Sequence, residues 1–333
     1  MQNQIFCSVI IPTIGRSTLE RAIQSILQQD FTQADFEIIV VNDSGQLLPE
    51  ASWQHEHRVK IIHTNRRERS FARNSGAAIA RGNYLVFLDD DDWFLPGALN
   101  NFHQLANQHP QAVWLYGGIH VIDEAGTCLA ELNSGWEGNC FAQIMGGAWA
   151  PIQSSLMQTA TFFQLGGFNP AICGTEDEDL CRRYAGCGEF ANTPAALACL
   201  FRGRSWDTST NYLRAPADTR LSRDLLLAEK GSFQRLMASA RSSYWKGRIC
   251  HSYLSTASWN LKRKRFFSAL SRGLFGLATM IRSGKDVFRK DFWDGIQDHH
   301  VPGTLHYVMQ SYEQKIRKGS LERTTTDIKG DKC

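Results

Sequence analysis

Short apolar runs alternate with amphipathic stretches over the first third of the chain. The runs have the length of buried strands and cover residues 6–11, 36–41, 59–63, 84–88 and 113–122. Stretches with helical spacing follow Ser17 and cover residues 69–80 and 96–108, and Gly82 is placed to cap the second of these helices. This alternation predicts an α/β domain with a mostly parallel sheet and helices on both faces. Ligands of such sheets gather at the carboxyl ends of the strands.

The pattern changes in the second half of the chain. Residues 135–206 are irregular and rich in glycine and aromatic residues, which is typical of a segment that shapes an acceptor cleft. After Leu221 the spacing becomes helical. We therefore predict an α/β domain at residues 1–220, a basic amphipathic helical region at 221–318 and a polar, disordered tail at 319–333.

The charge of the chain is unevenly distributed. Hydrophobic residues make up 43% and charged residues 21%, as in an ordinary globular protein. Residues 232–290 contain thirteen Lys or Arg and one acid, a local charge of +12, so the net charge of +3 leaves 3 − 12 = −9 for the remainder. A basic segment on an acidic body suggests a polyanion or an anionic membrane surface as its neighbour. We do not expect nucleic acid as a partner.

An apolar stripe in the basic segment has two interpretations. Its members follow the basic residues 262–265 at helical spacing: Phe266, Leu270, Leu274, Leu277, Ala278 and Ile281. The helix either packs on the α/β domain or lies on an anionic membrane as an interfacial helix.

The nine cysteines show no CxxC or CxxH pairing, which favours free thiols in a reducing compartment. The amino terminus has no basic region before its short apolar stretch, and no window reaches about 18 apolar residues. We therefore expect a cytoplasmic protein, peripheral at most to the inner face of the plasma membrane.

Four consecutive aspartates, Asp89 to Asp92, directly follow the apolar run at residues 84–88. Carboxylates this close repel one another by roughly 2–3 kcal/mol per pair at an effective dielectric near 20. In extended backbone, Asp89 and Asp91 would point one way and Asp90 and Asp92 the other. One such pair is enough to hold a hard divalent cation that also binds phosphate. The alternative is a solvated acidic turn.

The motifs and their order resemble those of the family 2 glycosyltransferases, which have a GT-A fold. The resemblance covers roughly residues 5–205. It rests on SVIIPT at 8–13, IIVVND at 38–43, ARNSG at 72–76, LDDDD at 88–92, GGF at 166–168 and TEDEDL at 175–180. Each motif is weak alone, but together and in this order they are a strong signal. The resemblance implies the transfer of one sugar from a nucleoside diphosphate sugar, a UDP-sugar above all, to a carbohydrate or lipid-linked acceptor in cell-surface or exopolysaccharide biosynthesis.

The resemblance also implies roles on the donor side. Asp91 is expected to bind the divalent metal, Mg²⁺ or Mn²⁺, which neutralises the leaving diphosphate. Asp89 and Asp90 would hold ribose, water or metal. Asp92 is expected to cap the following helix or to accept a backbone hydrogen bond.

Asp43 is expected to bind the nucleotide base, with Thr13 and Arg73 nearby. A local turn is an equally weighted alternative for Asp43, and an ordinary surface position is an alternative for Arg73. Arg16 and the basic residues at 66–69 would attract phosphates, unless they form only a solvated loop.

On the acceptor side, the family motif implies that Asp177 is the base that removes the proton of the attacking hydroxyl. Glu176 would orient this base or contact the acceptor. A base opposite the leaving group implies single displacement with inversion. An acidic first turn, favoured by the helix dipole, would explain one or two of these acids but not four.

The chain departs from the family after this helix. Many members have a His there, whereas residues 201–206 read FRGRSW. Either Arg202 or Arg204 would contact the diphosphate instead, or the reaction would depend less on the metal. A Gln-x-x-Arg-Trp motif is absent, which disfavours a processive synthase. A nucleotidyltransferase and a non-catalytic sugar-nucleotide-binding protein stay open as alternatives.

Overall fold

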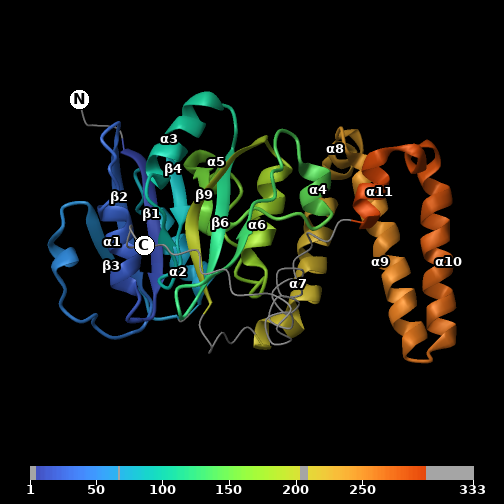
Figure 1. Cartoon of the computed structure of the whole chain (residues 1–333), viewed down its shortest axis with the longest axis horizontal. Coiled ribbons are helices and arrows are strands. Elements are labelled where there is room, and N and C mark those ends of the chain that lie inside the picture. Colours follow the sequence, from blue (N-terminus) through green and yellow to red (C-terminus); the bar gives the residue numbers. More distant parts are fainter. Residues whose placement is uncertain (1–4, 67, 203–208, 298–333) are drawn as a thin grey trace.

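The computed structural model describes residues 5–66, 68–202 and 209–297, and it consists of a sheet domain followed by helices (Figure 1). The strands are β1 (Ile5–Thr13), β2 (Asp35–Asn42), β3 (Val59–His63), β4 (Tyr84–Phe87), β5 (Trp93–Phe94), β6 (Trp114–Asp123), β7 (Cys128–Leu132), β8 (Ser155–Gln158) and β9 (Phe190–Arg202). The α-helices are α1 (Leu19–Leu27), α2 (Arg69–Ala78), α3 (Ala98–Gln108), α4 (Phe141–Met145), α5 (Thr159–Gln164), α6 (Glu176–Ala185), α7 (Ser209–Ala228), α8 (Ser232–Ala238), α9 (Ser242–Lys262), α10 (Phe266–Ser283) and α11 (Lys290–Gln297). Short 3-10 helices are η1 (Ser52–His55), η2 (Ile152–Ser154) and η3 (Gly284–Phe288).

The strands form one sheet in the order β3-β2-β1-β4-β8-β6-β9-β5, and β7 pairs with β6. Strands β3, β2, β1 and β4 run parallel, and so do β6 and β9. Strand β8 lies between β4 and β6 and is antiparallel to both. The predicted α/β class is confirmed, but the sheet is mixed, because β5, β7 and β8 pair antiparallel with their neighbours.

Three strands of the parallel half, β1, β2 and β4, are buried on both faces, whereas the edge strand β3 is mostly half-buried. Val9 and Ile11 of β1 pack with α1 and α3, whereas Ile10 packs on the opposite side with α2 and α6. This two-residue alternation explains why the strands appear in the sequence as continuous apolar runs. The core therefore has two layers, one on each face of the sheet.

The segment predicted to be irregular is more regular than expected. It contains β8, α5, α6 and the 13-residue strand β9. Strand β9 pairs with β6 through register shifts near Gly118. A Cβ atom on the neighbouring Gly117 would lie 2.6 Å from the carbonyl oxygen of Ala195. The strand was hidden in the sequence because small residues and irregular pairing replace the usual apolar alternation.

Helix α2 carries residues of the candidate site, and its ends are well defined. The Glu68 carboxylate accepts hydrogen bonds from the backbone N–H groups of Ser70 and Phe71, which caps the helix at its start. The predicted cap by Gly82 is wrong, because the helix ends at Ala78 and Ile79 is its C-cap. Gly82 instead lies against β1, where its N–H donates to Ser8 Oγ at 2.9 Å.

The carboxyl-terminal helices extend the molecule away from the sheet (Figure 1). Helix α7 packs on α6, α9 contacts α4, and α10 packs mainly on α9. The predicted packing of α10 on the sheet domain is therefore not what the structure shows, and Phe267 on this helix is 91% exposed. None of the described helices is long and apolar enough to cross a membrane. The predicted boundary at residue 220 falls inside α7, so the domain division stays a prediction, and the tail at 319–333 lies outside the described residues.

Candidate active site

The aspartate run is a turn and not an extended strand. The backbone N–H of Asp92 donates to the carbonyl of Asp89 at 3.1 Å, which folds the run back on itself. The expected alternation of side chains is therefore wrong. Asp89, Asp91 and Asp92 converge, with one carboxylate oxygen of each within 4.8 Å of the others. Asp90 alone points elsewhere.

Asp92 is the most buried member of this convergent group. Its Oδ1 accepts the backbone N–H of Phe201 at 2.9 Å, which is the second of its two predicted roles. The predicted helix cap is wrong, since α3 begins at Ala98 after Gly97. Its Oδ2 is buried and makes no hydrogen bond of ordinary geometry to the described residues. Burial, followed by repulsion from Asp89 and Asp91, raises the pKa of Asp92 well above its usual value.

Asp91 has a similar but more open environment. Burial, followed by the charge of Asp89, raises the pKa of Asp91. Three carboxylates that converge and repel one another fit a hard cation such as Mg²⁺ or Mn²⁺, which binds oxygen ligands. The predicted metal ligands Asp89 and Asp91 thus lie together, and the structure adds Asp92 to them.

Asp90 is held by the loop that follows β1. Thr13 Oγ1 donates to Asp90 Oδ2 at 2.5 Å, and Gly15 N–H donates to Thr13 Oγ1 at 2.9 Å. Arg16 forms an ion pair with Asp90 and lies 3.4 Å from Asp91. Burial raises the pKa of Asp90, against the opposing effect of Thr13 and Arg16. Thr13, Arg16 and Asp90 therefore form one group, and the Arg16 side chain remains 50% exposed for a further anion.

Arg73 joins the two acidic segments of the chain. It is 2% exposed, so the predicted surface alternative is wrong. Its Nη2 lies 2.7 Å from Asp89 Oδ1, and its Nη1 lies 3.0 Å from Glu176 Oε1. Burial lowers the pKa of the guanidinium, but the two carboxylates outweigh burial and leave it raised. The more exposed Arg69 adds a contact of 3.3 Å to Glu176.

The same guanidinium has different effects on its two partners. Burial acts to raise the pKa of Asp89, but Arg73 and then Arg69 outweigh burial and hold that pKa below its usual value. At Glu176, burial dominates and the pKa is raised in spite of Arg73. The sequence did not predict that Arg73 binds both Asp89 and Glu176. Helical spacing shows which residues share a face of α2, but not which acids of other elements lie against that face.

Asp177 lies in the first turn of α6 and is partly accessible. Its Oδ1 accepts the backbone N–H of Glu178 at 2.9 Å. Burial, followed by the charge of Glu178, raises its pKa, while Arg73 opposes the shift. A carboxylate with a raised pKa is a stronger base, which suits proton removal.

The other two acids of this turn have structural partners. Glu178 forms an ion pair with Arg182, and Asp179 lies 2.7 Å from Arg183, each one helical turn along α6. The acidic motif therefore divides into two residues that stabilise the helix and two that face the site.

Asp43 organises the loop between β3 and α2. Its carboxylate accepts hydrogen bonds from Thr64 Oγ1, Arg66 N and Glu68 N at 2.7–2.8 Å. The predicted local turn is made by its neighbour Asn42, whose Oδ1 accepts the N–H of Ser44. The predicted contact of Asp43 with a nucleotide base stays a prediction.

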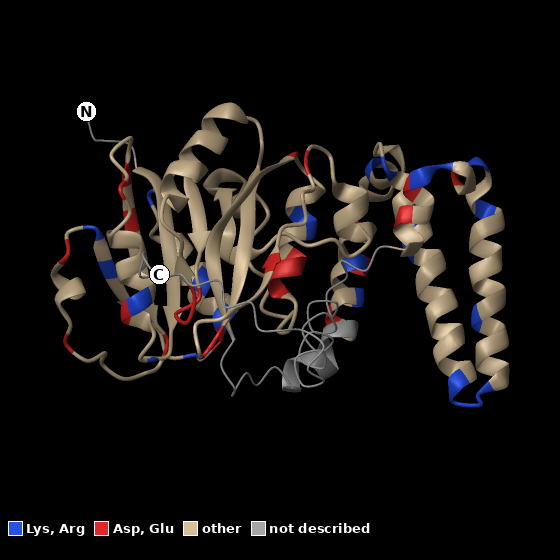
Figure 2. Ribbon diagram, viewed as in Figure 1, with Lys and Arg blue, Asp and Glu red and all other residues tan. Residues whose placement is uncertain are grey.

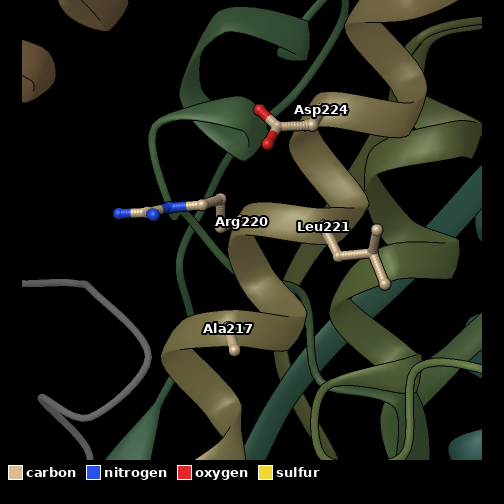
Figure 3. A pocket seen from close by; sticks show the side chains of 4 residues that line it. All are labelled: Ala217, Arg220, Leu221 and Asp224. Atoms are coloured by element: carbon tan, nitrogen blue, oxygen red, sulfur yellow. The ribbon is translucent and has the colours of Figure 1, made fainter.

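Helix α7 fixes the chain just before α6. Asp218 Oδ2 accepts the backbone N–H of Gly174 at 3.0 Å. On the outer side of the same helix, a surface depression is lined by Ala217, Arg220, Leu221 and Asp224 (Figure 3). Arg204 lies outside the described residues, as does the side chain of Arg202, so their predicted contact with the diphosphate stays a prediction.

The sequence of the sheet domain identifies its family. A model described as "Glycosyl transferase family 2" matches residues 8–163. Residues 8–163 therefore form a family 2 glycosyltransferase domain. The matched region contains the aspartate turn, Thr13, Asp43 and Arg73, whereas Glu176 and Asp177 lie beyond it.

Curated relatives match about half of the chain or less. An uncharacterized glycosyltransferase of Haemophilus influenzae is 24% identical over 176 residues, which are 52% of this chain and 59% of the relative. A GalNAc(5)-diNAcBac-PP-undecaprenol beta-1,3-glucosyltransferase of Campylobacter jejuni is 36% identical over 146 residues, 42% of either chain. A putative colanic acid biosynthesis glycosyl transferase of Escherichia coli, WcaA, is 32% identical over 127 residues, which cover 36% of this chain and 45% of that protein. The chain thus spans less than two thirds of these relatives.

A solved structure shows the same fold. Residues 1–349 of TarS from S. aureus, in complex with UDP-GlcNAc, align with a TM-score of 0.54 and 16% identity, over 84% of this chain and 92% of that one. The predicted GT-A type of fold is thereby confirmed.

Proposed function

We propose that this family 2 glycosyltransferase domain transfers one sugar, with inversion, from a UDP-sugar to a carbohydrate or lipid-linked acceptor. The observation that carries the proposal is the pair of acidic groups held by one buried arginine. Asp89 and Glu176 contact the same guanidinium, so the candidate metal site and the candidate base motif lie next to each other. Sugar transfer needs both groups close together, because one serves the leaving diphosphate and the other the attacking hydroxyl.

On the donor side, a divalent ion bound by Asp89, Asp91 and Asp92 would supply Lewis-acid neutralisation of the diphosphate. Arg16 is half exposed beside Asp90 and Asp91 and would add a fixed cation for the same oxygens. Asp43 positions the loop that leads into α2 and would contact the base. The UDP moiety is supported by the TarS complex with UDP-GlcNAc, which has the same fold.

On the acceptor side, the Asp177 carboxylate takes the proton of the acceptor hydroxyl as its oxygen attacks the anomeric carbon. The bond between that carbon and the diphosphate oxygen breaks, and the diphosphate leaves with the electron pair. Glu176, fixed by Arg73 and Arg69, would orient the acceptor or the base. A lipid-linked acceptor is supported by the printed name of the Campylobacter jejuni relative, and polysaccharide synthesis by that of the Escherichia coli relative.

We place the reaction in the cytoplasm, next to the membrane that would hold such an acceptor. Among the described residues, the cysteines at positions 7, 140, 181 and 250 are free, buried thiols. Free thiols of this kind are typical of a reducing compartment.

The test begins with donor binding. UDP-sugars and other nucleotide sugars are screened by thermal shift with Mg²⁺, with Mn²⁺ and with chelator, and the products are identified by mass spectrometry. Release of UDP with transfer to an added acceptor supports the proposal. Consumption of added pyrophosphate, with formation of a nucleoside triphosphate and a sugar 1-phosphate, would instead indicate a nucleotidyltransferase.

Two variants separate binding from transfer. Asp177→Asn should retain donor binding and lose transfer, and Asp91→Ala should lose metal-dependent donor binding. Glu131→Gln is a matched control, since this acid is exposed on β7. Donor binding without transfer to any acceptor, unchanged by Asp177→Asn, would favour a non-catalytic sugar-nucleotide-binding protein.

A further inference from the structure

The outward face of α10 is apolar and exposed to solvent. Five of its side chains recur at spacings of three and four and so share one face of the helix. Their exposed fractions are 91%, 63%, 57%, 53% and 72% for Phe267, Leu270, Leu274, Leu277 and Ile281. An apolar stripe on a helix normally faces the core of a soluble domain. Here it faces away from it.

The opposite face of α10 packs on α9 through small residues. Gly276 is buried, and a Cβ atom at that position would lie 2.8 Å from Leu254 Cδ2. Phe275 stacks on Tyr253 of α9, with ring centroids 5.6 Å apart. The two helices therefore form a hairpin that is held by the close contact at Gly276 and by the aromatic stack. The bulky stripe has no partner among the described residues.

The turn of this hairpin is strongly basic. Lys262, Arg263, Lys264 and Arg265 connect the two helices, and all four are exposed. None of them forms an ion pair with an acid of the described residues. The guanidiniums of Arg263 and Arg265 lie 3.8 and 5.7 Å from the ring centroid of Trp259, which is 47% exposed. Figure 2 shows these cations at the free end of the hairpin, distant from the sheet.

We propose that the α9–α10 hairpin binds the surface of an anionic lipid bilayer. The stripe of α10 would lie at the boundary between headgroups and acyl chains, and the basic turn would contact the anionic headgroups. Tryptophan beside basic residues is typical of the same interfacial region. The apolar stripe of the hairpin complements the acyl chains of such a surface, and the basic turn complements its anionic headgroups.

Charge favours a bilayer over a second copy of the chain. A symmetric contact would bring the same surfaces of two molecules together. Residues 232–290 contain thirteen basic residues and one acid, so this surface has almost no carboxylates to offer the turn of a partner copy. An anionic bilayer supplies the missing negative charge.

Bilayer binding by the hairpin does not depend on the reaction. That the same bilayer presents a lipid-linked acceptor rests on the proposed function. Vesicle binding is therefore measured without donor, metal or acceptor. A chain that lacked the proposed activity would give the same vesicle binding.

The full chain is mixed with vesicles of neutral phosphatidylcholine, or of phosphatidylcholine with about one third phosphatidylglycerol, and bound protein is measured by flotation. We expect binding to the anionic vesicles that weakens at high salt. The variant Leu270→Gln/Leu274→Gln/Leu277→Gln should lose at least about tenfold in apparent affinity. Replacement of residues 262–265 with Gln should lower the apparent affinity about fivefold for each charge that contacts the surface. These side chains are exposed, so both variants should keep the melting temperature of the parent chain.

Matched controls are Leu47→Gln, which replaces a leucine that is 89% exposed on the sheet domain, and Lys230→Gln, which replaces an exposed lysine outside the hairpin. Both should bind like the parent chain. Absence of binding, equal binding to neutral vesicles, or equal loss in the controls would overturn the proposal. A concentration-dependent dimer that the triple leucine variant dissociates would assign the stripe to a second copy and would also overturn it.

Discussion

The buried Arg73 and the partly exposed Asp89 form an ion pair, with Nη2 of the guanidinium 2.7 Å from Oδ1 of the carboxylate. Helix α2 supplies the cation and the turn after β4 supplies the anion. The second nitrogen of the same guanidinium binds Glu176 at the start of α6. A planar guanidinium can hold two carboxylates in fixed directions, which an ammonium cannot. This one side chain therefore sets the distance between the candidate metal site and the candidate base motif.

The first prediction concerns this arginine. Arg73→Ala should destabilise the fold by about 3–5 kcal/mol, because it leaves two carboxylates inside the protein without their cation. Arg73→Lys should recover only part of the loss, since one ammonium cannot bind both acids in the same geometry. Arg69→Ala is the matched control, and it should cost at most about 1 kcal/mol because Arg69 is half exposed. Urea unfolding measures the free energy of unfolding of the three variants and of the parent chain.

The pH dependence of this loss has a definite sign. Arg73 holds the pKa of Asp89 below its usual value, so the stabilisation by the pair is present above the unfolded carboxyl pKa and is lost as pH falls. The difference between parent and Arg73→Ala should therefore keep its full value down to about pH 4 and should shrink as pH falls from about 4 toward about 2. A difference that stays constant over this range would contradict the ion-pair interpretation.

The sequence predicted the elements of the parallel half well. Strand β3 has the predicted bounds, and β1, β2 and β4 differ from the predictions by a few residues. Strands β1, β2 and β4 are buried on both faces, so burial and apolar composition coincide in them. Strands β8 and β9 were not predicted. Small residues and register shifts hide β9, and β8 is a short strand inserted antiparallel between β4 and β6.

The sequence also predicted which residues gather at the site, but not how they pair. Thr13, Arg16, Asp90 and Arg73 lie in the predicted region, at strand ends and on α2. The contacts between them depend on the turn at residues 89–92, which strand alternation could not anticipate. The role of α10 was left open because periodicity gives an apolar face but not the direction in which it points.

The second prediction separates the four aspartates. Asp91→Asn and Asp92→Asn should each weaken Mn²⁺ binding by at least about tenfold, since even the loss of an outer-shell partner of a metal costs about 10–100-fold. Asp90→Asn should have a smaller effect, because Asp90 faces Thr13 and Arg16. Isothermal titration calorimetry of each variant with Mn²⁺ and with Mg²⁺ measures whether the metal affinities follow this order. If Asp90→Asn were as harmful as Asp92→Asn, the convergent group would not be the metal site.

The third prediction concerns the pH dependence of transfer. Asp177 must be ionised to remove a proton, and burial followed by Glu178 raises its pKa. The value of kcat/KM should therefore fall on the acid side at a pH above the usual carboxyl pKa of about 4. Glu178→Gln removes a neighbouring negative charge and should shift this acid limb to lower pH.

The matched control for the pH profile is Asp179→Asn. This acid lies in the same helical turn but is paired with Arg183 and does not contribute to the raised pKa of Asp177. It should leave the position of the acid limb unchanged. The position of the limb reports the pKa of the base and not the amount of folded protein. A limb that neither variant moves would argue against Asp177 as the base.

The last prediction concerns the approach of Gly82 to β1. A Cβ atom at this position would lie 2.5 Å from the backbone nitrogen of Ser8 and 2.6 Å from the carbonyl carbon of Cys7. Backbone atoms of a central strand cannot move aside, so Gly82→Ala should destabilise the fold by more than about 2 kcal/mol. Gly273→Ala on α10 is the control, because a Cβ atom there meets nothing within 4 Å. That variant should be neutral or stabilising by up to about 1 kcal/mol, as alanine favours helix. Equal melting temperatures for the two variants would show that β1 and the turn before β4 are less tightly packed than described.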